Sequence, residues 1–137
     1  METYQDCIVF LLAKAYQKAH GNLKKRLHSY GLTPIQFLTL AALVEEDGTS
    51  AGEIGKRLVL DNATLSGVLD RLADRDWVEK QTDLKDKRLL RIYLTDKAKA
   101  LQEELGEERE QANVEILHSL SMEEKVLLKR LLRDVQA

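Results

Sequence analysis

The chain has 137 residues, enough for one domain with an extension and too few for two independent cores. Hydrophobic residues make up 44% and charged residues 32%, with one proline, which indicates a helix-rich globular protein rather than a disordered one. No apolar run approaches the roughly 20 residues of a membrane span, and the first apolar stretch lacks the pattern of a signal peptide. A single cysteine, Cys7, excludes an internal disulfide, so we expect a protein of the reducing cytoplasm, away from membranes.

The charges are unevenly distributed along the sequence. The 21 basic and 23 acidic residues nearly cancel, yet no acidic residue stands between Cys7 and Val44. Residues 80–91 contain five bases and two acids. A chain with this polarity can present a local basic face to phosphates despite an acidic total. Ordinary solvated helix surfaces would give the same pattern, so charge alone does not decide.

Two helices are predicted in the first third of the chain. Apolar residues recur at helical spacing through residues 4–29, which predicts a long first helix. Thr33, followed by Pro34 and by Gln36 at capping-box spacing, predicts the start of a second helix. We expect the buried face of that helix to carry Phe37, Leu40, Ala41 and Val44.

The next segment predicts two helices joined by a short turn. Ser50 and Glu53 form a second capping box, which begins a short helix. After the tight connection at Val59–Leu60, Asp61 can cap a helix that runs to about Arg75. The apolar stripe of this helix consists of Leu65, Val68, Leu69 and Leu72.

After Arg75 the apolar period changes from helical to alternating. Residues 77–80 and 90–94 resemble two short strands, and the polar stretch from Asp83 to Arg88 resembles a hairpin loop between them. Thr95 is placed to cap a long helix over residues 96–119. Ser121 and Glu124 form a third capping box, which begins a final helix with Leu127, Leu128, Leu131, Leu132 and Val135. The predicted fold class is mostly α with a small β-hairpin wing.

A short helix, a tight turn, a second helix and a charged hairpin follow the order of a winged helix-turn-helix. A DNA major groove about 12 Å wide admits one helix, whose groove side must be polar while its other side packs in the core. A polar face alone is usually a solvated helix surface, but a hairpin directly after it favours DNA binding. The residues that we predict to face the major groove are Asp61, Asn62, Thr64, Ser66, Gly67, Asp70 and Arg71.

The loop of the hairpin is predicted to be a second DNA contact. Narrow minor grooves attract arginine, and Lys85, Lys87 and Arg88 stand together in this loop. Asp86 precedes Arg88 by two residues, so its carboxylate can order the guanidinium. The alternative is a salt bridge that stabilises the hairpin without touching DNA. We predict that Lys85, Asp86, Lys87 and Arg88 form a DNA-binding wing and that double-stranded DNA is the partner.

Residues 32–101 resemble the multiple-antibiotic-resistance regulator (MarR) family. The most specific pieces are LTPIQF, DNATLSGVLDRL, the D-x-R at Asp86–Arg88 and the LT that closes the wing. The resemblance implies a DNA-binding domain over 32–95, and dimerisation helices over 1–31 and 96–137. It also implies a repressor that binds a pseudo-palindromic operator as a homodimer, with residues 62–71 in the major groove. One departure is Asp76, which stands where the family often has glycine.

The apolar residues of the two ends favour the homodimer independently. The final helix has a wide apolar stripe, and the first helix adds Ile8, Leu11, Leu12 and Ala15. Left uncovered, they would form a patch above the few hundred Å² that monomers roughly tolerate. A twofold dimer would cover the patch and present two recognition helices about one helical turn of DNA apart.

Regulation by a small molecule is implied by the resemblance alone. Family members commonly respond to small aromatic or phenolic anions that bind between the dimerisation helices and the DNA-binding lobe. Aromatic and histidine side chains at helical spacing are also common core residues. The candidates for lining such a ligand pocket are Tyr16, His20, His28, Tyr30 and Phe37.

Redox sensing through Cys7 is an alternative that the resemblance raises. Some family members sense organic hydroperoxides through a cysteine on the first helix. Counted back from Pro34, that cysteine would fall at Ile8, and its activating tyrosines at Asn22 and Thr33. Cys7 misses the position by one residue, about 100° around a helix. We therefore expect a buried, inert thiol.

No pattern in the sequence indicates a metal site, a cofactor or an enzyme. The three histidines are scattered, with no Cys/His pair at ligand spacing, so we expect no metal and no cofactor. No nucleophile–base pairing and no phosphate-binding glycine loop indicates an enzyme. The remaining alternative class is a winged-helix protein-interaction module that has lost DNA binding, which would not need the basic residues of the wing.

Overall fold

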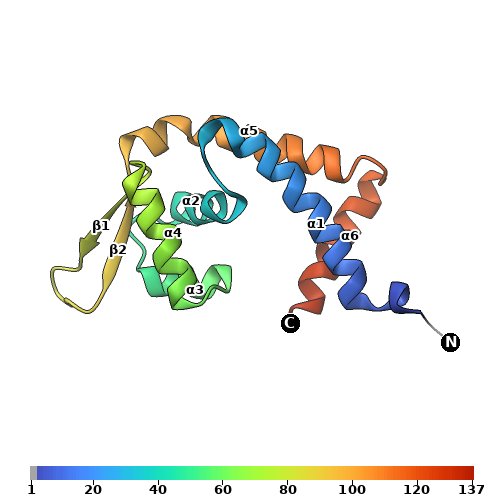
Figure 1. Cartoon of the computed structure of the whole chain (residues 1–137), viewed down its shortest axis with the longest axis horizontal. Coiled ribbons are helices and arrows are strands. Elements are labelled where there is room, and N and C mark those ends of the chain that lie inside the picture. The colour runs from blue at the N-terminus through green and yellow to red at the C-terminus, as the bar shows by residue number, and fades with distance from the viewer. Residues whose placement is uncertain (1–2) are drawn as a thin grey trace. The chain divides into compact units, whose positions relative to one another are not determined.

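A computed structural model describes residues 3–137 of the chain. By internal contacts they form two compact units, which we treat separately: the terminal unit, residues up to Arg26 with 107–137, and the central unit, residues 27–106. The elements in chain order (Figure 1) are η1 Tyr4–Asp6, α1 Ile8–Leu27, η2 His28–Tyr30, α2 Pro34–Glu45, α3 Ala51–Leu58, α4 Asn62–Asp74, β1 Val78–Thr82, β2 Leu90–Leu94, α5 Asp96–Ile116 and α6 Met122–Val135.

Helix caps predicted from the sequence place the starts of α2 and α6. The Thr33 hydroxyl accepts the Gln36 N–H at 3.3 Å, and the Gln36 side chain accepts the Thr33 N–H at 3.0 Å. Ser121 and Glu124 form the same reciprocal pair. Both capping boxes are confirmed, and each satisfies two backbone donors that a helix start would otherwise leave unpaired.

The capping box predicted before α3 is only half formed. The Ser50 hydroxyl accepts the Glu53 N–H at 3.2 Å, as expected. The Glu53 carboxylate, however, pairs with Arg57 one turn further along the helix instead of returning to the Ser50 N–H. A charged partner at i+4 competes with the backbone donor for the same carboxylate.

Several predicted boundaries were wrong by a few residues. The first helix does not run unbroken from 4 to 29, because Cys7 is extended between η1 and α1, and η2 replaces the α-helix after Leu27. Strand β1 covers Val78–Thr82 rather than 77–80, since its length follows its antiparallel pairing with β2, from Val78 opposite Leu94 to Thr82 opposite Leu90. Helix α5 ends at Ile116 rather than 119.

The central unit has the hydrophobic core. The predicted stripe of α4 is confirmed as buried. On α2, Phe37 and Leu40 are buried as predicted and Ala41 is half-buried, but Val44 is 43% exposed and Leu43 is buried instead. A shift of one residue turns a side chain by about 100°, so only one of these neighbours can face the core. The buried apolar side chains of this unit are Leu27, Leu32, Phe37, Leu40, Leu43, Ile54, Leu65, Val68, Leu69, Leu72, Trp77, Val78, Ile92, Leu94, Ala98 and Leu105.

The loop between α2 and α3 pairs with strand β2. The Gly48 N–H donates to the Ile92 carbonyl at 2.9 Å, and the Ile92 N–H donates to the Thr49 carbonyl at 3.0 Å. Gly48 has φ +82°, and a Cβ there would lie 2.6 Å from Cε1 of Tyr93. Glycine is therefore required, because the loop lies directly on the strand. This pairing fixes the start of α3 relative to the hairpin.

Within residues 3–137, Val59 and Asp76 are the residues other than glycine that have a positive φ. Asp76, at φ 64°, has the conformation that a glycine would adopt before the first strand, and aspartate tolerates it comparatively well. Val59 ends α3 at φ 55° and ψ 51°, with a side chain that is 89% exposed. A β-branched residue in the left-handed region is strained, and this one gains no burial in return.

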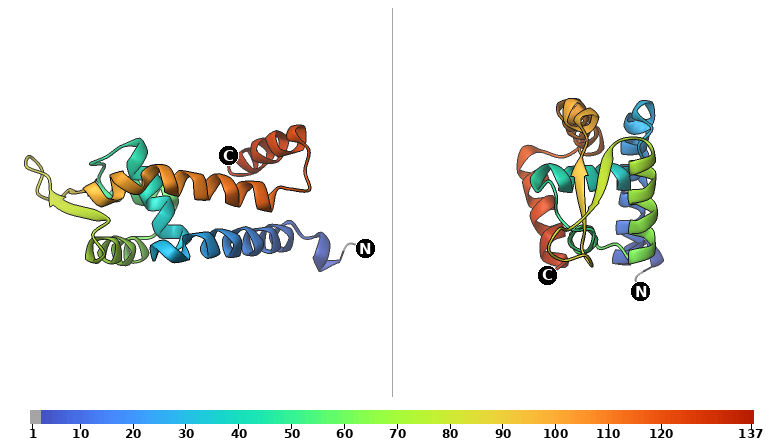
Figure 2. Two further views of the ribbon diagram at one scale, coloured as in Figure 1. Left: turned by 90° about the horizontal axis from the view of Figure 1, so that it is seen from above. Right: turned by 90° about the vertical axis from the view of Figure 1, so that its left-hand side faces the viewer.

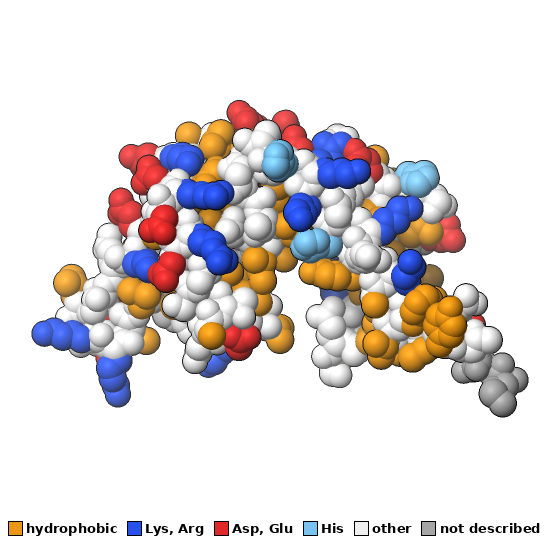
Figure 3. All heavy atoms as spheres, viewed as in Figure 1, with side chains coloured by type: hydrophobic (Ala, Val, Ile, Leu, Met, Phe, Trp, Pro, Cys, Tyr) orange, Lys and Arg blue, Asp and Glu red, His pale blue; other side chains and the backbone are white. Residues whose placement is uncertain are grey.

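The terminal unit leaves much of its apolar surface exposed. Arg26 of α1 forms ion pairs with Glu108, at 3.1 Å, and Glu115 of α5. Every residue of α6 is at least partly exposed. Apolar side chains gather around the first turns of α1 in the view of Figure 3. The exposed large apolar residues of α1 and α6 are Ile8, Val9, Leu11, Leu12, Tyr16, Met122, Val126, Leu127, Leu131, Leu132 and Val135.

Across residues 3–137, no single helix has both the length and the apolar character needed to cross a membrane. One bent pair, Ile8–Tyr30 with Pro34–Glu45, meets the requirement by length and composition only.

The strain at Val59 gives a testable prediction of stability. Val59→Gly should raise the free energy of unfolding by about 1 kcal/mol, because glycine adopts the left-handed conformation at a helix end without steric cost. Urea unfolding at fixed protein concentration measures the change. Val59→Ala serves as the control. Its free energy of unfolding should rise less, since alanine keeps a Cβ. A lower midpoint for the glycine variant would contradict the assignment of strain.

Candidate nucleic-acid interface

Helix α4 begins at a well-formed cap and packs closely against α3. The Asp61 carboxylate accepts the Thr64 N–H at 2.8 Å and the Thr64 hydroxyl at 3.0 Å. These hydrogen bonds hold the pKa of Asp61 below its usual value. Gly55 of α3 lies so near α4 that a Cβ on it would be 3.2 Å from Leu65. The cap and this close approach together position α4 in the unit.

The residues predicted to face the major groove lie on the outer side of α4 and its cap. All of them are exposed except Gly67, which is half-buried and has open space where a Cβ would be. Not all of their polar atoms are equally available. Asp61 and Thr64 bond to each other, and Asp70 forms an ion pair with Lys80 of β1. The last contact joins α4 to the hairpin.

A shallow hollow lies between α4 and the hairpin. Its volume is about 230 Å³, and α3, α4 and both strands contribute to its wall. Asn62, Ser66 and Asp70 line it from α4, and Lys80 and Leu90 line it from the strands. The polar face of the helix and the base of the hairpin thus border one continuous surface.

The hairpin tip presents an ordered arginine. Arg88 donates from Nε to Oδ1 of Asp86 at 3.1 Å and from Nη2 to Oδ2 at 3.3 Å, while its backbone N–H donates to Oδ1 at 3.0 Å. The side chain of Arg88 is nevertheless 90% exposed. These bonds to Arg88 lower the pKa of Asp86. The carboxylate therefore orders the guanidinium without burying it.

The other predicted wing residues, Lys85 and Lys87, are exposed beside Arg88. The hairpin extends beyond α2, α3 and α4 of the same unit (Figure 2). Basic side chains cover its end in the space-filling view (Figure 3). The structure thus brings the predicted wing residues together at one exposed tip.

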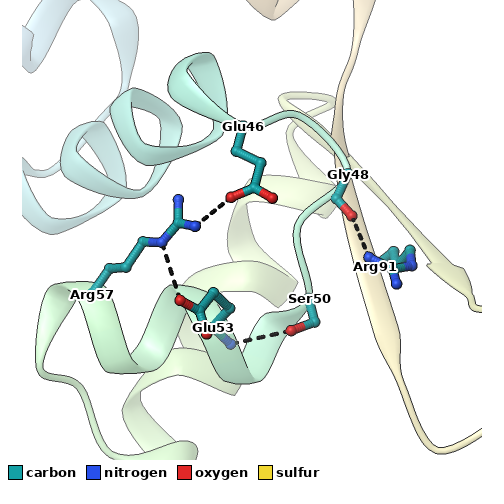
Figure 4. Close-up of polar contacts among 6 residues, drawn as sticks. All are labelled: Glu46, Gly48, Ser50, Glu53, Arg57 and Arg91. Atoms are coloured by element: carbon teal, nitrogen blue, oxygen red, sulfur yellow. Dashed lines mark hydrogen bonds and ion pairs between the residues drawn. The ribbon is translucent and has the colours of Figure 1, made fainter.

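A second arginine ties the loop end of the hairpin strands to the helix-turn-helix. Arg91 of β2 donates from Nε to Oδ1 of Asp83 at 2.9 Å. It also donates from Nη1 to the Gly48 carbonyl at 3.1 Å (Figure 4). The other Asp83 oxygen accepts the Asp86 N–H at 2.8 Å. Arg91, and then the Asp86 N–H, lower the pKa of Asp83. No local sequence pattern predicts this pair, whose only signal is an acid and a base on either side of the loop.

The predicted ligand-pocket residues fall in both units. Tyr16 and His20 belong to the terminal unit, where their ring centroids lie 5.5 Å apart. In the central unit His28 is exposed, the Tyr30 hydroxyl donates to Glu104 at 3.2 Å, and Phe37 is a core residue at 4% exposure. Their role in binding an effector stays a prediction.

Cys7 corrects one expectation, because its thiol is exposed rather than buried. It lies in the extended link between η1 and α1, so it is not on the inward face of a continuous helix. Among residues 3–137, no cluster of three or more His, Cys, Asp and Glu side chains has the arrangement of a metal site.

Comparisons with known proteins place this geometry in a family. The sequence model described as "MarR family" matches residues 30–89. The repressor NicR of Pseudomonas putida is 33% identical over 91% of this chain and 79% of its own length. The chain belongs to the MarR family. The regulator TtmR of Methylorubrum extorquens is 41% identical over 68% of the chain, which spans 46% of that longer relative.

Solved MarR-type structures confirm the predicted fold, mostly helical with a β-hairpin wing. One is the structure of BpsR from Bordetella bronchiseptica, which addresses the regulation of its DNA binding by 6-hydroxynicotinic acid. The match covers 99% of this chain and 97% of the BpsR chain, with 29% sequence identity and a TM-score of 0.92. A MarR variant of Escherichia coli, complexed with operator DNA, covers all of both chains with 26% identity and a TM-score of 0.89. The chain is therefore a DNA-binding transcriptional regulator of the MarR type and not an enzyme.

The lowered pKa values of the aspartates predict how the stability of the fold changes at low pH. Asp61, Asp83 and Asp86 titrate below 3.8 in the folded state, so the folded protein binds fewer protons there than the unfolded chain. Their stabilisation is fully present above that ordinary value and is lost as the pH falls through the folded values. We therefore expect the urea concentration at the unfolding midpoint to decrease when the pH is lowered below about 4, because these groups become protonated. Asp86→Asn should show a shallower fall in that range; a fall as steep as the wild type's would contradict the assignment.

Proposed function

We propose that the protein is a homodimeric repressor that binds a pseudo-palindromic operator, with α4 in the major groove and the hairpin in the adjacent minor groove. The observation that carries the proposal is the ordered but exposed Arg88 at the hairpin tip, in the same unit as the polar face of α4. The complex of the Escherichia coli MarR variant with operator DNA supports DNA as the ligand. The description of NicR as a repressor supports the direction of regulation.

The contacts within the interface suggest different roles for the predicted residues. Asn62, Ser66 and Arg71 lie on the outer side of α4, and their side chains suit hydrogen bonds to base edges or phosphates. Asp61 and Thr64 order the helix start, whose backbone N–H groups favour a phosphate. Asp70, paired with Lys80, holds α4 to the hairpin. Lys85 and Lys87 add phosphate contacts beside Arg88.

The homodimer is supported by the exposed apolar side chains of the terminal unit. Residues along both α1 and α6 leave large aliphatic groups in solvent, such as Ile8 on α1 and Val126 on α6. Burying apolar area is worth about 25 cal/mol per Å², and a soluble monomer rarely leaves so many large apolar side chains open. A symmetric partner that contributes the same helices would cover it.

The effector of the repressor is proposed to be a small aromatic or phenolic anion. Support comes from BpsR, whose DNA binding is regulated by 6-hydroxynicotinic acid. The candidate residues for its binding are Tyr16 and His20 of the terminal unit and His28, Tyr30 and Phe37 of the central unit. Action on chromosomal DNA also fits the cytoplasmic location that the sequence predicts.

Two other readings of the chain are weaker. An interaction module without DNA binding would have no need of an ordered, exposed arginine flanked by two lysines at the hairpin tip. Redox sensing has an accessible thiol at Cys7 in its favour. No tyrosine stands at the two positions where the hydroperoxide sensors have them, which are Asn22 and Thr33 in this chain.

Arg88→Ala tests the wing contact directly. Binding to a duplex selected by the wild-type protein from a random pool should weaken by about 1–3 kcal/mol, because the guanidinium is lost from the groove. Fluorescence anisotropy across a salt series measures affinity, and wild-type binding should weaken steeply as salt rises.

Arg109→Ala is the charge-matched control for this test. Arg109 belongs to α5 in the terminal unit and to neither α4 nor the hairpin, so its loss should leave the affinity nearly unchanged. Equal affinities for the Arg88 and Arg109 variants would show that Arg88 only stabilises the hairpin. Wild-type protein that binds no duplex at low salt would overturn the function itself.

The mass in solution tests the homodimer. Light scattering at micromolar concentration should give twice the 15.6 kDa chain mass. Leu131→Glu should shift the mass towards the monomer, because a carboxylate buried at the interface would lack a partner. A monomeric wild-type mass would contradict the proposed symmetric operator complex.

A further inference from the structure

Two arginines hold the loop between α2 and α3 from opposite sides. Arg57 of α3 pairs with Glu46, at the end of α2, and with Glu53 of its own helix. Arg91 of β2 reaches the same loop from the hairpin and donates to the Gly48 carbonyl at 3.1 Å. Figure 4 shows both arginines directed at this loop. The start of α3 is thus held by α2 on one side and by the hairpin on the other.

Arg91 also connects this loop to the hairpin tip. Its Nε bonds to Asp83, whose other carboxylate oxygen accepts the Asp86 N–H. Asp86 in turn holds the Arg88 guanidinium. A continuous series of hydrogen bonds therefore runs from the Gly48 carbonyl to the exposed arginine. The Asp83 N–H adds a bond across the loop, to the Leu89 carbonyl at 2.9 Å.

We propose that Arg91 and Asp83 are positioning residues for DNA binding, which fix the direction in which the hairpin tip presents Arg88 relative to the helix-turn-helix. The proposal rests on the proposed function. A two-stranded hairpin is marginally stable alone, and its loop would lose conformational freedom on binding. Ordering the loop before DNA arrives reduces that loss, and preorganisation of this kind increases affinity.

Asp83→Asn distinguishes a positioning role from a simple electrostatic one, because the two roles predict changes in DNA affinity of opposite sign. Removing a negative charge beside phosphates should tighten binding if the residue acts only through the net field. If Asp83 positions the tip, losing its charged bond to Arg91 should weaken binding instead. We expect a dissociation constant raised by about three- to tenfold, in the range of losses measured for coupled neighbours.

Glu79→Gln is the matched control on the same hairpin. Glu79 is an exposed residue of β1, opposite Tyr93, and takes no part in the bonds between Gly48 and Arg88. Its neutralisation makes the same change in charge without altering the loop. We expect unchanged or slightly tighter binding. A second variant, Arg91→Lys, keeps the charge but lacks the planar fork that bonds Asp83 and Gly48 together, so it should also weaken binding.

The experiment measures anisotropy of a labelled duplex that the wild-type protein has selected from a random pool. Each variant is measured in the wild-type and in the Arg88→Ala background, with circular dichroism to record the unfolding midpoint. If Asp83 acts through Arg88, Asp83→Asn should weaken DNA binding little further in the Arg88→Ala background. In the otherwise wild-type protein, Asp83→Asn should also reduce the slope of affinity against salt concentration. A variant that is merely less stable, but still folded at the assay temperature, would give neither of these two results.

The outcomes distinguish this inference from the proposed function. Tighter binding by Asp83→Asn, as for Glu79→Gln, overturns the positioning role while wild-type binding still supports the function. Losses by Asp83→Asn that are equal in the two backgrounds also overturn it, since the residue would then act independently of Arg88. Absence of wild-type binding overturns the proposed function.

Discussion

The proposed DNA-binding surface of this chain depends on the backbone pairing between the α2–α3 loop and strand β2. The exchange of hydrogen bonds between Gly48, Thr49 and Ile92 fixes the start of α3, and through the close approach of Gly55 it fixes α4 as well. The same strand continues into the hairpin. One short stretch of pairing thus determines the relative placement of the helix and the wing, and only glycine fits at residue 48.

An acidic chain presents a basic hairpin tip here because the carboxylates of the hairpin loop are bonded to neighbouring groups. Asp83 bonds Arg91 where the strands meet the loop, and Asp86 orders Arg88 while leaving it exposed; Asp61 is used in the same way to cap α4. Each carboxylate thereby orders a group beside it instead of acting as an isolated charge near phosphates. This arrangement explains why the net charge of −2 carries so little information about the partner.

The sequence predicted what is determined locally and missed what depends on distant partners. The caps at Thr33, Asp61 and Ser121 and the stripe of α4 follow from short-range spacing, and the structure confirms them. The end of β1, the exposure of Cys7 and the bond between Asp83 and Arg91 depend on strand pairing, on where a helix begins and on how a loop folds back. No local pattern encodes them. The predicted groove contacts and ligand-pocket residues stay predictions.

In the proposed function, the outer side of α4 contacts DNA. A photoactivatable amino acid at Ser66, in the middle of that face, tests it most directly, with the same probe at Val114 of α5 as reference. On irradiation with a selected duplex, the Ser66 probe should form covalent links to DNA and the Val114 probe should not. Links from Ser66 to a second protein chain, with none to DNA, would place this face in a protein interface and contradict the account.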